Sequence, residues 1–188
     1  MNTYKNKINF ETTLAYEAQA LSVNRGLIQY LFDAVSVEDT TASLLDKSAG
    51  IDLIIQRGDG RVYGVGVRCR REDYGTFTVS KHISRPNSQM NRVLDSVENS
   101  FQVRPMHPQY ILQLNGCDDS WRCRGSILLV QVPVFASWVE TVDLEGHYLP
   151  YLDAYEFRVD SNEPTSGIRN LANPNKTKEI YTDSLCFV

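Results

Sequence analysis

Hydrophobic and polar positions follow two different periods along this chain, and these periods predict its helices and strands. Between residues 10 and 32, apolar side chains recur near every 3.6 residues, as on one face of an α-helix. These side chains are Leu14, Ala18, Leu21 and Leu27. Gly26 lies inside the segment, at a place where a glycine either ends a helix or is tolerated within it. We therefore expect one long N-terminal helix.

The segment from 51 to 70 predicts a β-hairpin. Residues 33–49 are rich in Asp, Thr and Ser and predict a turn-rich connection into a strand over Ile51–Gln56. Asp59 and Gly60 then form an Asp-Gly pair, which is a strong signal for a tight turn between antiparallel strands. The valines of residues 61–70 favour β structure for the second strand.

Alternating helical and β patterns continue after the hairpin. Residues 76–80 predict a third strand, 88–101 a second helix, and 109–114 and 126–132 two more strands. A short helix is expected over 135–140, after Pro133. The resulting order of helix, three strands, helix and two strands predicts an α/β fold.

The periodicity fades after Gly146, where Pro, Asn, Ser and Thr become frequent. Aromatic residues at 148, 151, 155 and 157 still offer apolar area for packing. We therefore expect residues 1–145 to form one α/β core, and residues 146–188 to form an extension that packs on this core without being a separate domain.

Composition indicates a soluble globular protein of the cytoplasm. Hydrophobic residues make up 42% of the chain and charged residues 22%, which is close to the globular average. The longest apolar stretch, 127–139, is interrupted by polar residues and is shorter than the roughly 20 residues that span a bilayer. Because residues 1–10 are polar, they do not resemble a secretory signal. No membrane association is expected.

The cysteine spacing, the net charge and the motifs of the sequence argue against several classes of protein. The four cysteines are unevenly spaced and predict reduced thiols rather than a disulfide framework or a zinc site. The net charge of -4 argues against coating of nucleic acid by bulk attraction, but basic residues concentrate between 57 and 81. Common nucleotide-binding and hydrolase motifs, such as GxxxxGK[ST], GxSxG and HExxH, are absent from the sequence.

The predicted hairpin has an arrangement suited to metal-assisted cleavage of a phosphodiester. Such cleavage needs carboxylates that hold a divalent cation and a cationic side chain that steadies the phosphate. Asp52 begins one strand, and the triplet Gly66, Val67 and Arg68 lies in the next. Since residues two apart in a strand share a face, the hairpin presents both kinds of group at one end of a sheet.

With its helix-first order and the runs AGIDLII, GDGR and VYGVGVRCR over residues 49–70, the chain resembles the PD-(D/E)XK, or restriction-endonuclease-like, nuclease superfamily. The resemblance implies a central mixed β-sheet flanked by helices, a magnesium ion and DNA as substrate, in prokaryotic or phage-type defence or DNA processing. It implies a metal-binding role for Asp52, with Gly66 where the second acid belongs and Arg68 in place of a lysine. It also implies a metal-binding role for Glu17, or alternatively Glu11, on the first helix. The Val67 carbonyl would complete the metal site, and Asp46 or Glu17 would replace the missing acid if the fold brings it close.

Each of these positions also has a structural interpretation. In this interpretation, Asp52 only ends a turn after Gly50, and Arg68 pairs with an acid inside a strand. Glu17 then belongs simply to the polar face of a helix. A second patch has hydroxyl and cationic groups that suit contact with a nucleic-acid backbone. Alternatively, its charges lie on an edge strand and prevent that strand from pairing with another chain. Its residues are Arg70, Arg71, Thr76, Thr78, Lys81 and Arg85.

Two functional hypotheses follow from the sequence. The first is a nuclease-fold protein that contacts DNA, with a degraded active site for magnesium-dependent cleavage. The second is a non-catalytic subunit that keeps the scaffold and binds a protein partner or a second copy of itself. The second hypothesis predicts an apolar surface patch over residues 138–157, and an Asp52 side chain engaged by backbone hydrogen bonds.

Overall fold

Two β-sheets and the helices around them make up the part of the chain that the structure describes. This computed structural model describes residues 10–41, 43–80, 107–152, 154–159 and 166–171, with side chains from residue 18 onward except at 47, 48 and 80. The elements are α1 (Phe10–Phe32), β1 (Ala34–Asp39), α2 (Leu44–Ala49), β2 (Leu53–Arg57), β3 (Val62–Cys69), β4 (Thr76–Ser80), β5 (Tyr110–Leu114), β6 (Ile127–Gln131), α4 (Val132–Val139), the 3₁₀ helix η1 (Leu144–His147), β7 (Tyr148–Leu149), β8 (Ala154–Arg158) and β9 (Ile168–Leu171).

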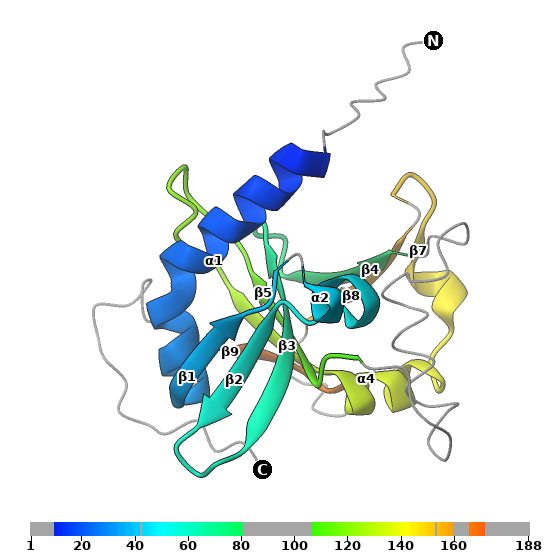
Figure 1. Cartoon of the computed structure of the whole chain (residues 1–188). Helices are drawn as coiled ribbons and strands as arrows, with labels where there is room; N and C mark the ends of the chain where they lie inside the picture. Colours follow the sequence, from blue (N-terminus) through cyan, green and yellow to red (C-terminus); the bar gives the residue numbers. More distant parts are fainter. Residues whose placement is uncertain (1–9, 42, 81–106, 153, 160–165, 172–188) are drawn as a thin grey trace.

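The larger sheet is mixed and has six strands in the order β1-β2-β3-β5-β6-β9. Strands β1, β2 and β3 form an antiparallel meander, whereas β5 runs parallel to β3. A parallel neighbour needs a crossover connection, and the chain between β3 and β5 includes the whole of β4. The predicted α/β class with a mixed sheet and flanking helices is therefore confirmed at this level (Figure 1).

One face of this sheet is covered by α1. The side chains of Leu21, Ile28 and Leu31 on the helix join Leu53, Ile55, Val65 and Leu112 of the sheet in one buried cluster. The helix has the bounds expected from its 3.6-residue pattern and continues through Gly26, where an added Cβ would meet nothing within 4 Å. At an exposed position of this kind, a glycine weakens a helix without ending it.

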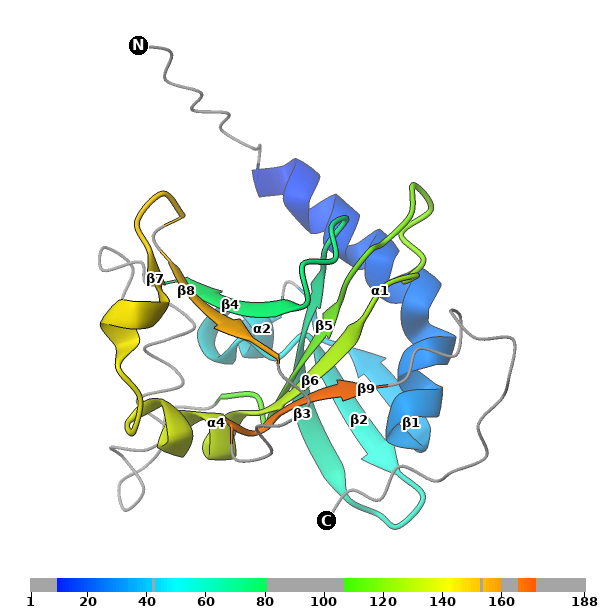
Figure 2. The same cartoon turned by 180° about the vertical axis from the view of Figure 1, so that it is seen from behind.

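The opposite face carries the second sheet and α4. Strands β4, β8 and β7 form a three-stranded antiparallel sheet, which is seen beside β6 and β9 in Figure 2. Phe77 of β4 and Phe157 of β8 pack with Phe135 of α4 against Leu128 and Val130 of β6. Edge-to-face contacts join Phe135 to both of the other rings, at centroid distances of 5.4 and 5.1 Å.

Several elements differ from their sequence predictions. The turn-rich connection at 33–49 contains a strand, β1, and a helix, α2, whose N-cap Ser43 accepts hydrogen bonds from the N–H groups of Leu45 and Asp46. The predicted third strand, 76–80, has the expected bounds but belongs to the smaller sheet. Helix α4 begins three residues earlier than expected, because Pro133 fits the first helical turn.

The C-terminal region contributes strands to both sheets. Strand β8 is the middle strand of the smaller sheet, and β9 pairs with β6 at the edge of the larger one. The helix predicted for 88–101 lies outside the described residues. None of the helices that the structure describes combines the length and hydrophobicity of a bilayer-crossing segment.

Candidate functional site

Asp52 lies between the end of α2 and the start of β2. Gly50 adopts a left-handed conformation, with φ of 65°, and its N–H donates to the Asp46 carbonyl, so helix α2 ends there. The Asp52 N–H then donates to the Val65 carbonyl at 3.0 Å. Its side-chain Oδ2 accepts a hydrogen bond from the Val67 N–H at 2.6 Å. The carboxylate is therefore fixed against the middle of β3.

Gly66 lies directly beside this carboxylate. A Cβ placed on Gly66 would be 3.0 Å from the Gly50 carbonyl oxygen and 3.8 Å from Asp52 Oδ2. The backbone of the turn approaches β3 so closely that a side chain there would force it to move. The glycine is therefore explained by close packing, and a second acid at this position would not fit without a backbone shift.

Arg68 extends from the same face of β3 as Gly66. Its guanidinium donates to the Thr78 carbonyl of β4 and lies over the Phe77 ring, 5.5 Å from the centroid. The pKa of Arg68 is lowered to about 9, first by burial and then by the charge of Arg70, whereas Asp52 acts in the opposite direction. The charged form of Arg68 is therefore held at a substantial cost in desolvation.

Arg70 continues the same face of β3, two residues further along. Its guanidinium donates to the Thr78 hydroxyl, and burial lowers its pKa while the nearby Glu156 of β8 opposes this shift. The Thr76 hydroxyl donates to Glu156 Oε2 at 3.3 Å. Both arginines are half-buried as residues, and their guanidinium groups link β3 to β4 of the other sheet.

A buried glutamine completes this group and was not anticipated from the sequence. Gln113 of β5 is paired in register with Arg68 and is fully buried. Its Nε2 donates to the Thr76 carbonyl at 2.8 Å and to Asn115 Oδ1 at 2.9 Å, whereas its Oε1 is buried without a partner among the described residues. A polar residue within the otherwise apolar run YILQL was the available signal.

The remaining predicted residues are distributed differently. Thr76 and Thr78 are 7% and 6% exposed and serve the contact between the sheets rather than a surface. Arg71 is exposed, pairs with Asp119 at 3.0 Å and lies over the Trp121 ring at 5.1 Å, away from Arg70. Val67 is half-buried and packs against the α1 side of the sheet.

The other ligands that the resemblance implies remain predictions. Asp46 lies in the first turn of α2. The Glu17 side chain, Lys81 and Arg85 lie outside the described residues, but the described part of α1 covers the face of the sheet opposite to Gly66 and Arg68. Among the side chains that the structure describes, no three His, Cys, Asp or Glu groups are arranged to hold a metal ion.

The arrangement as described is suited to binding an anion. Two adjacent guanidinium groups, a threonine hydroxyl and one fixed carboxylate are held between rigid strands.

Comparisons of the chain with protein-family models, with curated proteins and with solved structures find no match.

Proposed function

We propose that this protein is a DNA-binding protein on a restriction-endonuclease-type scaffold, and that Arg68 and Arg70 hold a backbone phosphate. The observation that carries the proposal is the pair of partly dehydrated guanidinium groups on one face of β3. Burial of these cations is costly even with Asp52 and Glu156 nearby, because the pKa of each arginine stays lowered, and an anion that enters the site relieves this cost. The planar fork of donors on an arginine matches the oxygens of a phosphate.

The order of elements supports the scaffold. The helix α1 precedes the β1-β2-β3 meander, Asp52 lies just before β2, and Arg68 lies on the neighbouring strand β3. Asp52 and Gly66 also face the same side of the sheet, since the added Cβ of Gly66 would approach Asp52 Oδ2. The site positions of the resemblance are thus neighbours in space, although the second acid is replaced by a close backbone contact.

The proposal is limited to binding, because the described residues lack the ligands for metal-dependent cleavage. Magnesium binds through carboxylates and water in near-octahedral geometry. Asp52 has one oxygen engaged by the Val67 N–H, and Gly66 contributes no ligand. No hydrolytic step is therefore derived for the described residues.

The experiment is a fluorescence anisotropy titration of labelled duplex and single-stranded DNA at several salt concentrations. Wild type is expected to bind with a Kd in the range of roughly 10⁻⁴ to 10⁻⁶ M. Arg68→Met and Arg70→Met should each weaken binding and reduce the slope of log K against log salt by about 1. Arg169→Met removes the same charge from exposed β9, at the far edge of the sheet, and serves as the control.

Two outcomes would overturn this proposal. One is wild-type protein that shows no saturable binding at low salt, and the other is an equal loss in the Arg169→Met control. Parallel incubations with Mg²⁺ and Mn²⁺ address cleavage, and products that disappear in Asp52→Ala would replace binding alone by the nuclease hypothesis.

A second candidate function, a non-catalytic assembly subunit, is favoured by two observations. The Asp52 side chain is engaged by a backbone N–H, and Tyr151 and Leu152 are 78% and 52% exposed in the turn between β7 and β8. Most of the aromatic side chains of residues 138–157 instead pack internally, as His147 does on Phe157 at 4.9 Å. Light scattering of wild type and a Tyr151→Ser, Leu152→Ser double variant tests self-association, and a monomeric wild type argues against a homodimer.

A further inference from the structure

A short hairpin between β5 and β6 places two cysteines opposite each other. Cys117 and Cys123 form an isolated antiparallel bridge. The hydrogen bonds on either side run from Asp118 N–H to the Arg122 carbonyl, at 3.1 Å, and from Arg124 N–H to the Gly116 carbonyl, at 3.2 Å. This pattern makes the cysteines a non-hydrogen-bonded pair.

Such a pair has the spacing that a disulfide requires. The Cα atoms of a non-hydrogen-bonded antiparallel pair lie about 4.5 Å apart, and their side chains approach more closely than those of a hydrogen-bonded pair. Disulfides form at Cα separations of about 4.4 to 6.8 Å. The hairpin therefore allows a bond between the two sulfur atoms without a large backbone movement.

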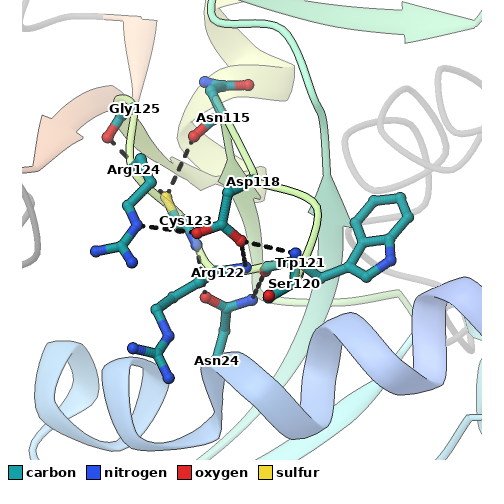
Figure 3. A network of polar contacts seen from close by, with 9 residues as sticks. All are labelled: Asn24, Asn115, Asp118, Ser120, Trp121, Arg122, Cys123, Arg124 and Gly125. Atoms are coloured by element: carbon teal, nitrogen blue, oxygen red, sulfur yellow. Dashed lines mark hydrogen bonds and ion pairs between the residues drawn. The ribbon is translucent and has the colours of Figure 1, made fainter.

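Side-chain and backbone hydrogen bonds hold the hairpin in this conformation, and the Cys123 thiol also donates to the carbonyls of Asn115 and Gly125 (Figure 3). Asn24 of α1 donates to the Trp121 carbonyl at 2.7 Å, and its Oδ1 accepts from the Cys123 N–H at 3.0 Å. Asp118 Oδ1 accepts from the N–H groups of Ser120 and Arg122, each at 3.0 Å. The positions of both cysteines are thus fixed while the thiols are reduced.

The two thiols are protected but chemically different. Cys117 and Cys123 are 5% and 0% exposed, and both are free thiols in this structure. Hydrogen bonds from the thiols of Cys123 and Cys69 lower the pKa of Cys117, whereas its interaction with Cys117 and its burial raise the pKa of Cys123. Cys117 is therefore the nucleophile of the pair, because the thiolate is the reactive form.

We infer that Cys117 and Cys123 form a reversible disulfide, which closes the 117–123 hairpin when the protein meets a low-molecular-weight disulfide such as oxidised glutathione. The Cys117 thiolate attacks one glutathione sulfur, and one glutathione thiolate leaves. Cys123 then loses its proton and attacks the Cys117 sulfur, which releases the second glutathione. Two electrons pass from the cysteine pair to the glutathione disulfide.

Burial of the two cysteines affects the rate of disulfide exchange, and the Cys69 thiol affects which partner Cys117 takes. Because both sulfur atoms are nearly closed to solvent, exchange is limited by opening of the hairpin. Cys69 also contacts Cys117, so it is the internal competitor for the same sulfur. The antiparallel bridge favours Cys123 over Cys69 as the partner, since it fixes the geometry of that pair.

The test uses the full chain with Cys186→Ser, which removes the cysteine outside the described residues. The protein is equilibrated in glutathione redox buffers, quenched with N-ethylmaleimide in acid, and analysed by intact mass and peptide mapping. We expect a two-hydrogen loss that maps to Cys117 and Cys123 and persists in Cys69→Ser. Cys117→Ser and Cys123→Ser should each abolish this product.

A second measurement separates the inference from failure of a variant to fold. The same redox titration in urea, without any further substitution, should need a ratio of oxidised to reduced glutathione about tenfold or more higher than in native buffer, because the native hairpin favours closure. A bond that maps to Cys69, a lasting mixed disulfide with glutathione, or easier oxidation in urea than in native buffer would overturn the inference. Its outcome is independent of DNA binding.

Discussion

Replacing Arg68 by methionine is expected to stabilise the protein, although it removes a hydrogen bond. Folding lowers the pKa of this arginine by more than three units from its ordinary value, to about 9, mainly through burial. At about 1.4 kcal/mol for each tenfold change in acidity, holding the charged form in the folded state costs about 5 kcal/mol. Methionine keeps much of the apolar length of the side chain without a charge to desolvate.

The gain is smaller than this cost because of the partner that is left behind. The substitution leaves the Thr78 carbonyl without the guanidinium donor, which costs about 1 to 3 kcal/mol. A net stabilisation of about 2 to 4 kcal/mol remains, which corresponds to a rise of about 4 to 16 °C in Tm for a protein of this size. This result would indicate that Arg68 is needed for function, although it lowers the stability of the fold.

The assay is urea denaturation followed by circular dichroism for wild type, Arg68→Met and Arg169→Met, at pH 7 and at pH 10.5. A basic group whose pKa falls on folding lowers the stability of the native state at any pH below its folded pKa, where it is charged in both states. This loss of stability decreases as the pH rises above the folded pKa, because the folded protein then releases the proton. The advantage of Arg68→Met should therefore shrink by about 2 kcal/mol between the two pH values, starting near pH 9.

Two results would refute this reasoning. A loss of more than about 1 kcal/mol in Arg68→Met would show that the arginine stabilises the contact between the sheets, as structural ion pairs do when they are broken. A stability difference that does not change with pH would show that burial of the charge is not the dominant contribution.

Three further predictions concern neighbouring features. Asp52→Asn keeps an acceptor for the Val67 N–H but removes the negative charge near Arg68, so binding of DNA without metal should tighten by roughly threefold in an anisotropy titration, whereas weaker binding would argue against the phosphate site. Gly66→Ala should destabilise the protein by about 1 to 3 kcal/mol in urea denaturation, because its Cβ would meet the Gly50 carbonyl at 3.0 Å, and an unchanged midpoint would contradict the close contact. Asn24→Ala should cost about 2 to 3 kcal/mol in the same assay, since it removes the hydrogen bonds of Asn24 to two backbone groups of the hairpin, and a loss below about 0.5 kcal/mol would mean that water replaces the side chain.

Sequence patterns predicted the elements whose signals are local. The 3.6-residue spacing gave α1 with its observed bounds, and Asp59-Gly60 marked the turn between β2 and β3. The connection at 33–49 was misjudged because β1 is mostly exposed, with Val37 its only buried residue. Strand pairing supplies the stability of such an element, so its own sequence is a weak signal.

The candidate site was found in part. The sequence placed Asp52 and Arg68 on adjacent strands of a hairpin, and the structure brings them within electrostatic reach of each other. Two features required the third dimension: Thr78 comes from a strand of the other sheet, and Gln113 reaches Arg68 through the parallel pairing of β3 and β5. Neither partner is specified by spacing along the chain.

The sequence by itself determined the α/β class, the N-terminal helix and the strands rich in apolar and β-branched residues, because these follow from backbone propensity and near-neighbour contacts. Only the tertiary structure decided that β4 belongs to the smaller sheet and that the Gly50 carbonyl leaves no room for a side chain at Gly66. The desolvation of Arg68 likewise follows only from the tertiary structure. These properties arise where segments distant in sequence exclude water and crowd one another, and burial of that kind is set by the whole fold.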